Sequence, residues 1–224
     1  VQLSSRAVSE FSDYLRGLAD ERRAHPQDDL ISALVAAEFA GERLTENQLI
    51  ANCILLLNAG HEATVNGITS ALLLLFRNRA QREQLLEAAV SPGGEALFAT
   101  AVDELLRYDT PLPLFRRWVL EDVEYNGQLI ERGTEVALLY ASGNRDPRRF
   151  ERADELVLTR ADNPHLAFGH GIHFCLGAQL GRLELQIALQ TLLRRCSNIR
   201  LATDRVQYNS GFVIRGVKAL PVAW

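Results

Sequence analysis

Methionine is absent from the 224-residue sequence, and cysteine is scarce: Cys53, Cys175 and Cys196 are far apart and form no Cys-x-x-Cys pair. Three widely separated cysteines do not make a disulfide framework, so we expect a reducing compartment, the cytoplasm. No secretory leader is visible, because apolar residues follow helical spacing from the start of the chain. We therefore expect the chain to be the later part of a longer protein.

Long blocks of like charge and long apolar runs are missing as well. The net charge of −4 gives no sign of nucleic-acid binding. The longest apolar segment is interrupted by polar residues well inside the length of about 20 residues that a membrane span requires. These residues are Asn52, Asn58, His61, Glu62 and Asn66. We expect no nucleic-acid partner and no membrane segment in this portion of the protein.

The composition that remains, 47% hydrophobic and 23% charged, is typical of a globular protein. No internal repeat, low-complexity segment or flexible linker interrupts it, so we predict that residues 1–224 belong to one domain without an internal boundary. Apolar periodicity and capping patterns predict helices ending near 23 and 41, and others over 46–76, 79–89, 97–108 and 177–195. A hairpin at Asn126-Gly127 and strands over 135–140, 199–202 and 213–222 complete a mainly α fold with small β-sheets.

The segment Phe168–Gly177 concentrates the most unusual chemistry, and it reads Phe-Gly-His-Gly-Ile-His-Phe-Cys-Leu-Gly. Glycines placed so densely around Cys175 suit a backbone that takes left-handed dihedrals or lies against a flat ligand. The predicted helix 177–195 follows directly, and free amides at a helix N-terminus stabilise a thiolate. We predict that Cys175 is a metal-ligating thiolate, with iron as the leading interpretation.

Two alternatives for this segment remain open at the level of the residues. His170, His173 and Cys175 are residue types that bind zinc, although nothing in the sequence completes a site for that metal. Cys175 could instead be an inert buried cysteine beside helix-capping glycines. The sequence contains no Gly-x-Ser-x-Gly and no phosphate-binding loop, which argues against a serine hydrolase or a nucleotide-binding protein.

Two helices carry weaker signals. On the long helix, Asn58, Glu62 and Asn66 form a polar stripe at a spacing of four residues, and the small pair Ala59-Gly60 leaves room for a bulky group. Hydrogen-bonded buried polar groups would explain the stripe equally well. On the helix 97–108, Glu104 and Arg107 are three residues apart and share one face, as many solvated ion pairs do.

Taken in order, these motifs resemble the C-terminal half of a cytochrome P-450 of the soluble bacterial type. The family's cysteine loop, Phe-Gly-x-Gly-x-His-x-Cys-x-Gly, is matched at Phe168, Gly169, Gly171, His173, Cys175 and Gly177. Residues 59–62 resemble the distal-helix motif, Glu104 and Arg107 match the Glu-x-x-Arg pair, and residues 144–147 match a bacterial turn. The resemblance spans essentially the whole chain but only about half of a typical family member.

The resemblance implies that the cofactor is haem b and that Cys175 is the proximal ligand of its iron. Phe168 would pack on the sulfur side, and Gly169 and Gly177 would shape the loop. His173 and Arg117 would hold the haem propionates through charge-assisted hydrogen bonds. Arg116 would replace Arg117 if the register shifted by one residue.

The remaining roles implied by the resemblance lie on the two helices. Ala59 would border the haem on the long distal helix, where Glu62, Ala63 and Thr64 occupy the catalytic positions. Glu104 and Arg107 would form a buried structural pair near the proximal face.

The chain departs from the family pattern near this structural pair. A third residue, an arginine, usually joins the pair, but Glu155 occupies the expected position. Arg152 or Arg160 could substitute, or the network could be incomplete.

A second departure affects proton delivery. The family usually has an alcohol directly after the distal acid, whereas here Ala63 follows Glu62 and Thr64 comes one residue later, about 100° around the helix. We expect Thr64 to point elsewhere. The hypothesis is that protons reach the reaction through Glu62, ordered water and a hydroxyl of the substrate.

The function implied is that of a haem-thiolate monooxygenase, of which this chain is a fragment. It would insert one oxygen atom from O₂ into a small organic substrate, with electrons from a ferredoxin or flavoprotein. One alternative is an inactive truncation product that lacks haem or self-associates; another is a peroxide-driven or rearranging haem-thiolate enzyme. Candidates for the apolar lining of a substrate site are residues 112–114, Phe212 and Val213.

Overall fold

The computed structural model describes residues 2–39, 41–211 and 213–224, so Phe212 lies outside the described residues. Helices dominate, and the strands form two-stranded antiparallel sheets, which confirms the predicted fold class. The chain divides into two compact units, residues 1–61 and 62–224, and the division falls inside one continuous helix, α3 (Glu46–Arg77). The absence of an internal domain boundary therefore stays a prediction.

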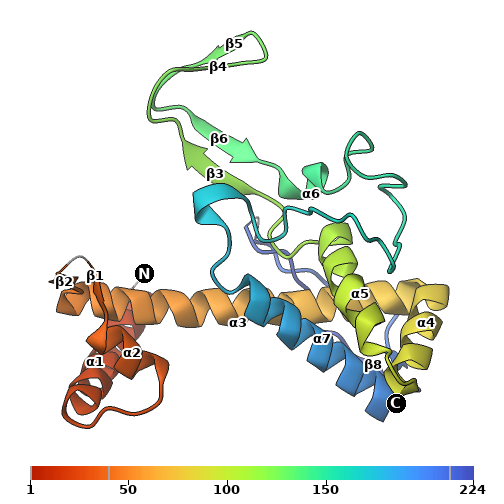
Figure 1. Ribbon diagram of the computed structural model, residues 1–224, viewed down its shortest axis with the longest axis horizontal. Helices are drawn as coiled ribbons and strands as arrows, with labels where there is room; N and C mark the ends of the chain where they lie inside the picture. Colours follow the sequence, from red (N-terminus) through yellow and green to blue (C-terminus); the bar gives the residue numbers. More distant parts are fainter. Residues whose placement is uncertain (1, 40, 212) are drawn as a thin grey trace. The chain divides into compact units, whose positions relative to one another are not determined.

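The first unit contains α1 (Gln2–Ala24), α2 (Leu30–Ala36), the short strands β1 (Glu38–Phe39) and β2 (Glu42–Arg43), and the beginning of α3 (Figure 1). Asp29 caps α2 by accepting a hydrogen bond from the Ser32 amide at 2.8 Å. A side-chain hydrogen bond from Arg22 lowers the pKa of Asp29 to about 2. The carboxylate thus stays charged at the positive end of α2.

The start of α3 follows the capping box in the sequence. The Thr45 amide donates to Gln48 Oε1 at 2.9 Å, and the Gln48 amide donates back to Thr45 Oγ1 at 3.4 Å. Across the described residues, no helix combines the length and the apolar character that crossing a lipid bilayer requires.

The second unit is built on the rest of α3 together with α4 (Arg79–Val90), α5 (Glu95–Tyr108) and α7 (Ala178–Arg195). Both α4 and α5 pack against α7, and α4 packs against α5 (Figure 1). Their apolar stripes form one core, which includes Leu75, Leu85, Phe98, Leu105, Leu189 and Leu193. This core holds α5 and α7 in fixed positions, and the polar residues that they carry are fixed with them.

A small sheet lies between α5 and the cysteine loop in the sequence. Strand β3 (Phe115–Trp118) pairs antiparallel with β6 (Glu135–Leu138), and the hairpin of β4 (Val123–Tyr125) and β5 (Gln128–Ile130) connects them. Asn126 and Gly127 have φ of 51° and 75°, as a two-residue hairpin turn of this type requires, and the predicted hairpin is confirmed. The strand predicted to reach Tyr140 stops at Leu138, because the helix α6 (Tyr140–Gly143) begins at Tyr140.

The end of the chain contains less strand than predicted. β7 (Arg200–Leu201) pairs with β8 (Val222–Ala223), and an isolated bridge joins Tyr208 to Val217. Continuous strand over 213–222 is wrong. Here the backbone passes tightly over α3 at one point, since a Cβ on Gly216 would lie 1.6 Å from Asn66 Oδ1.

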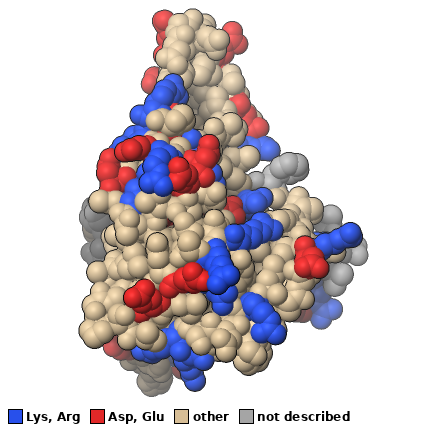
Figure 2. Space-filling model, turned by 90° about the vertical axis from the view of Figure 1, so that its right-hand side faces the viewer, with Lys and Arg blue, Asp and Glu red and all other residues tan. Residues whose placement is uncertain are grey.

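On the face of the molecule shown in Figure 2, basic and acidic side chains lie interspersed. Ion pairs of the chain include Arg149 with Asp162 at 3.0 Å and Arg145 with Asp154 at 3.1 Å. Exposed pairs of this kind contribute little to the free energy of unfolding.

Candidate functional site

The cysteine loop is a tightly hydrogen-bonded turn that leads into α7. Gly169 and Gly171 have φ of 73° and 74°, a region that other residues rarely adopt, and the short 3₁₀ helix η1 (Gly171–His173) follows. The Cys175 amide donates to the Phe168 carbonyl at 2.9 Å, and the Cys175 carbonyl accepts from the Ala178 amide at 3.2 Å. Cys175 is therefore held directly before the N-terminus of α7, as the sequence predicted.

The side chain of Cys175 is exposed, and the neighbouring side chains Ile172 and Leu176 are 97% and 90% exposed. The alternative of an inert buried cysteine therefore has no support in this chain. Among the described residues, no three or more His, Cys, Asp and Glu side chains group together to hold a metal ion. The zinc alternative, which needs His170, His173 and Cys175 to converge, has no support.

Aromatic contacts fix the start of the loop. The Phe168 ring lies 6.3 Å from the Phe174 ring and 5.7 Å from the His165 ring, and the Arg182 guanidinium lies 4.5 Å from its centre. The ring lies against α7, since a Cβ added to Gly181 would be in ordinary van der Waals contact with Phe168 at 3.7 Å. The ring is thus packed between the loop and α7. Its packing on the sulfur side of Cys175 stays a prediction.

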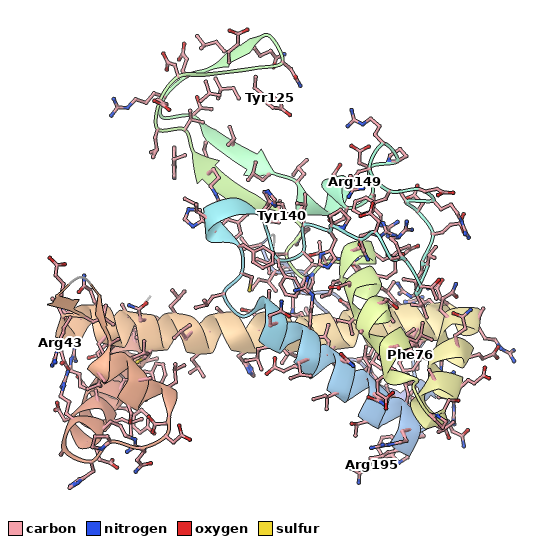
Figure 3. The ribbon with its side chains drawn as sticks, in the orientation of Figure 1. Arg43, Phe76, Tyr125, Tyr140, Arg149 and Arg195 are labelled. Atoms are coloured by element: carbon pink, nitrogen blue, oxygen red, sulfur yellow. The ribbon has the colours of Figure 1, made fainter. Side chains whose placement is uncertain are left out.

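A pocket of about 370 Å³ adjoins the loop and brings together residues from three segments. Arg117 comes from β3, Tyr140 from the start of α6, and His173 from the loop. Figure 3 shows Tyr140 where β6 passes into α6, and a Cβ on Gly169 would lie 3.8 Å from its hydroxyl. The side chains of Arg117 and His173, from segments far apart in the sequence, thus line one cavity.

Arg116 takes no part in this pocket. Successive residues of a strand point to opposite faces, and Arg116 pairs instead with Glu135 on β6 at 3.2 Å. Of the two arginines left open by the sequence, the structure thus brings Arg117 close to His173.

The pair Glu104 and Arg107 on α5 is completely buried, with both side chains 0% exposed. Arg107 donates to both carboxylate oxygens of Glu104, at 2.8 and 2.9 Å. Its remaining hydrogens go to the backbone carbonyls of Asn144, Ala153 and Glu155 at 2.7 to 3.0 Å. Such a fully satisfied bidentate pair can be buried without an uncompensated charge.

Arg160 supplies the third member of the network. Its Nε lies 3.0 Å from Glu104 Oε2, whereas Arg152 forms an exposed ion pair with Glu155. Burial tends to raise the pKa of Glu104, but the hydrogen bonds from Arg107 and the Val157 amide, with the charge of Arg107, hold its pKa below the ordinary value. The network that the sequence left open is therefore complete.

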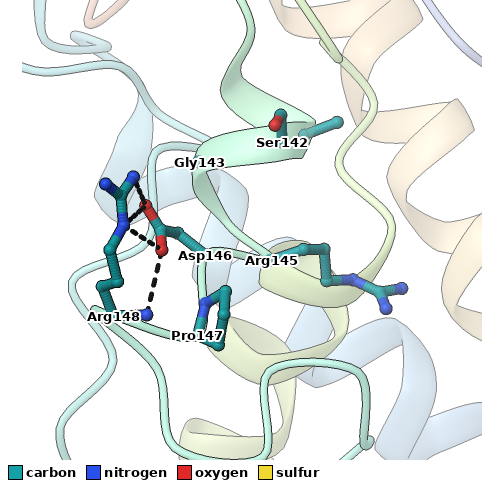
Figure 4. A pocket seen from close by; sticks show the side chains of 7 residues that line it. Ser142, Gly143, Arg145, Asp146, Pro147 and Arg148 are labelled. Carbon is teal, nitrogen blue, oxygen red and sulfur yellow. Dashed lines mark hydrogen bonds and ion pairs between the residues drawn. The ribbon is translucent and has the colours of Figure 1, made fainter.

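The turn at residues 144–147 links this network to the cysteine loop. Asn144 is 0% exposed; its carbonyl accepts from Arg107 at 2.7 Å and its Oδ1 accepts from the Leu166 amide at 2.6 Å. The turn also lines a shallow pocket of about 550 Å³, where Arg148 folds back onto Asp146 (Figure 4). The hydrogen bond from Arg148 lowers the pKa of Asp146 to about 2.

Glu62, Ala63 and Thr64, the predicted catalytic positions, lie on α3. The Thr64 hydroxyl donates to Glu184 on α7 at 3.2 Å, so it is directed toward the helix that follows the cysteine. Ala63 is half-buried and Glu62 is exposed. Asn66 is buried and donates to the Glu62 carbonyl at 2.9 Å, so this member of the polar stripe is satisfied within the helix.

Sequence reasoning missed a second polar cluster, formed by Asp103, His165 and Arg182. Asp103 Oδ1 lies 3.0 Å from His165 Nε2 and 2.7 Å from Arg182 Nε. Asp103 directly precedes Glu104, and adjacent residues on a helix point about 100° apart. His165 and Arg182 lie 62 and 79 residues from Asp103 in the sequence, so no local pattern could have revealed the cluster.

A comparison with protein families finds that a family model described as Cytochrome P450 matches residues 2–213. The polyketide biosynthesis cytochrome P450 PksS of Bacillus subtilis is 42% identical over 99% of this chain and 54% of its own length. Nocardicin C N-oxygenase of Nocardia uniformis is 44% identical, again over 99% of this chain and 54% of the relative.

A solved structure of PksS from the bacillaene polyketide synthase of Bacillus subtilis superposes with a TM-score of 0.93 and 42% identity. The superposition covers 99% of this chain and 56% of that structure. The chain therefore spans about half the length of the curated relatives it matches.

Proposed function

We propose that this chain, which belongs to the cytochrome P450 family, is part of a haem-thiolate monooxygenase that inserts one oxygen atom from O₂ into a small organic substrate. Members of the family are haem-thiolate monooxygenases. The observation that carries the proposal is the exposed Cys175 before the N-terminus of α7, next to a pocket lined by Arg117 and His173.

The residues on this surface fit haem b. Haem b is a flat apolar macrocycle with two carboxylates, and its iron takes a thiolate as proximal ligand. Cys175 offers the thiol, and the exposed side chains of Ile172 and Phe174 offer an apolar surface beside it. Arg117 and His173 would hold the propionates, since both line one pocket.

The chain's own residues have three tasks in this proposal. When bound, haem b with a thiolate ligand supplies the activation of O₂. Phe168, Gly169 and Gly177 hold the cysteine loop in its shape, and Cys175 binds the iron. Ala59 borders the haem in the proposal, as the distal motif implies; that role stays a prediction.

Proton delivery is the task of the distal residues. Because Ala63 has no hydroxyl and Thr64 donates to Glu184, Glu62 with ordered water would carry protons, assisted by a hydroxyl of the substrate. The test is the coupling of electron consumption to product in Ala63→Thr, with the nearly isosteric Val65→Thr as control. If the unmodified enzyme is poorly coupled with every substrate and only Ala63→Thr is well coupled, substrate assistance is wrong.

The central experiment is the absorption spectrum of the whole protein after reduction and addition of carbon monoxide. We expect a red-shifted Soret band of the thiolate type; purified whole protein without haem absorbance would overturn the proposal. The same spectrum on this 224-residue chain tests the alternative of an inactive or self-associating truncation product. Product formed with ferredoxin and reductase, but not with peroxide alone, would exclude the peroxide-driven alternative.

Arg117 and Arg116 provide a matched pair for the haem contacts. Loss of one charge-assisted hydrogen bond should speed haem release by about tenfold in Arg117→Gln. Arg116→Gln should release haem like the unmodified protein, because Arg116 pairs with Glu135. Equal release from both variants would contradict the role of Arg117.

The remaining expectations belong to this proposal. Electrons would come from a ferredoxin or flavoprotein. The cytoplasmic location rests on the cysteine pattern, and all three cysteines are free in the structure.

A further inference from the structure

Asp103 lies at the centre of a cluster that contacts the cysteine loop at Phe168. One oxygen, Oδ1, accepts hydrogen bonds from both His165 and Arg182, which are 62 and 79 residues away in the sequence. Burial tends to raise the pKa of Asp103, but the hydrogen bonds from His165 and Arg182 outweigh it and hold the pKa below the ordinary value. The carboxylate is therefore charged and holds both partners at once.

His165 is fixed in one tautomer by its neighbours. The Ala167 amide donates to His165 Nδ1 at 3.1 Å, so Nδ1 carries no proton and the ring proton is on Nε2, facing Asp103. The side chain is 1% exposed. A buried ring bonded on both nitrogens cannot rotate without losing one of its two hydrogen bonds.

Both partners of Asp103 contact the same third residue. The Arg182 guanidinium lies 4.5 Å from the centre of the Phe168 ring, and the His165 ring lies 5.7 Å from it. The carbonyl of Phe168 accepts the amide hydrogen of Cys175. A continuous series of contacts thus runs from Asp103 through Arg182 and His165 to Phe168, and from there to Cys175.

We propose that Asp103 is a positioning residue for the cysteine ligand: it holds Arg182 and His165 against the Phe168 ring and so fixes the loop that presents Cys175. The inference rests on the proposed function, since it concerns how well the thiolate stays on the iron. Glu104, the next residue, has a different task, because its carboxylate holds Arg107 and Arg160 on another side of α5.

The test uses the whole protein with its haem and measures how fast the thiolate-type carbon monoxide band converts to the blue-shifted form that has lost the thiolate. Asp103→Asn removes a charged acceptor shared by two hydrogen bonds, so we expect conversion at least about tenfold faster. Asp103→Glu should restore most of the stability of the band. Asp154→Asn is the control, because Asp154 is 88% exposed and pairs with Arg145 at 3.1 Å.

A double-mutant cycle shows whether Asp103 acts through Phe168. In a Phe168→Leu background, Asp103→Asn should add little to the conversion rate; full additivity would overturn the inference. Unchanged conversion in Asp103→Asn alone would overturn it as well. If Asp103→Asn does not fold, Arg182→Lys replaces it: the charge next to Asp103 is kept but the flat group over Phe168 is lost, and conversion as slow as in the unmodified protein counts against the inference.

The unmodified protein separates the two proposals. If it shows the thiolate band and Asp103→Asn behaves like Asp154→Asn, the inference fails and the proposed function stands. If the unmodified protein shows no thiolate band, the proposed function fails and the inference fails with it.

Discussion

Glu104 and Cys175 both lie where several segments of the second unit meet, but their side chains have opposite surroundings. The Glu104 carboxylate is completely buried and accepts hydrogen bonds from Arg107, Arg160 and the Val157 amide. The Cys175 side chain is exposed, and the hydrogen bonds that hold the residue are made by its backbone. The Glu104 side chain thus stabilises the fold, whereas the Cys175 side chain is free to contact a ligand.

Asn144 shows that the two regions are nevertheless connected. Its carbonyl accepts from Arg107 in the network, and its side chain accepts from the amide of Leu166, two residues before Phe168. The buried network thus anchors the segment that enters the cysteine loop. Changes to Glu104 should therefore lower the stability of the fold, whereas changes to Cys175 should abolish ligation and leave the fold intact.

Replacing Cys175 gives the largest expected effect on the ligand side of this comparison. Cys175→Ser should abolish the thiolate-type band completely, because an alcohol does not replace a thiolate as the proximal ligand. The free energy of unfolding without haem should change by only about 0.5 kcal/mol or less, since the side chain is exposed. Spectra after reduction and carbon monoxide, and urea unfolding, measure the two effects. Cys196→Ser is the control and should keep the band.

Replacing Glu104 gives the largest expected effect on the fold. Glu104→Ala leaves Arg107 and Arg160 buried without their partner, which typically costs about 3–5 kcal/mol of unfolding free energy. Urea unfolding followed by circular dichroism measures it. Glu155→Ala, which removes an exposed carboxylate paired with Arg152, should leave the transition nearly unchanged. A similar loss of unfolding free energy in both variants would mean that the buried network stabilises the fold no more than the surface pair does.

The third member of the network can be tested with two arginines. Arg160→Gln removes a charge-assisted hydrogen bond to Glu104 from a side chain that is 10% exposed, and should cost about 1.5–3 kcal/mol. Arg152→Gln removes a partner of Glu155 at the surface and should have little effect on the unfolding transition. The reverse order would mean that Arg152 substitutes for the missing arginine.

The sequence predicted most of the helices because each has an apolar stripe, and α3 also has a local start signal at Thr45 and Gln48. The end near residue 41 predicted for the second helix was wrong, because α2 ends at Ala36 and the strand β1 begins at Glu38. It also predicted the hairpin at Asn126-Gly127, whose turn chemistry depends on two adjacent residues. The continuous strand over 213–222 was wrong: of the residues described there, only Val222 and Ala223 form a strand, and Val217 forms an isolated bridge with Tyr208. Which distant segment lies beside this stretch depends on the tertiary fold, which no local pattern reveals.

The site was predictable only where a motif is contiguous in the sequence. The loop around Cys175 is such a motif, and its hydrogen bonds join residues a few positions apart. Whether Arg152 or Arg160 reaches Glu104 depends on how the loop after α6 folds over α5, which spacing does not fix. The cluster of Asp103, His165 and Arg182 depends on the packing of α5 against α7, and propensity carries no information on it.

The smallest expected effect is the change of unfolding free energy with pH, which compares buried Glu104 with exposed Glu155. The pKa of Glu104 is lowered from its ordinary 4.5 in the folded protein, so its stabilising contribution is complete above that value and is lost as the pH falls below it. The fall in unfolding free energy as the pH is lowered from 5 to 3 should therefore be shallower in Glu104→Gln. Hydrogen bonding from Arg152 also lowers the pKa of Glu155, but at the surface. Because salt screens exposed charges, about 0.5 M NaCl should remove the share of Glu155 and leave that of Glu104; loss of both in salt would mean that water reaches the buried network.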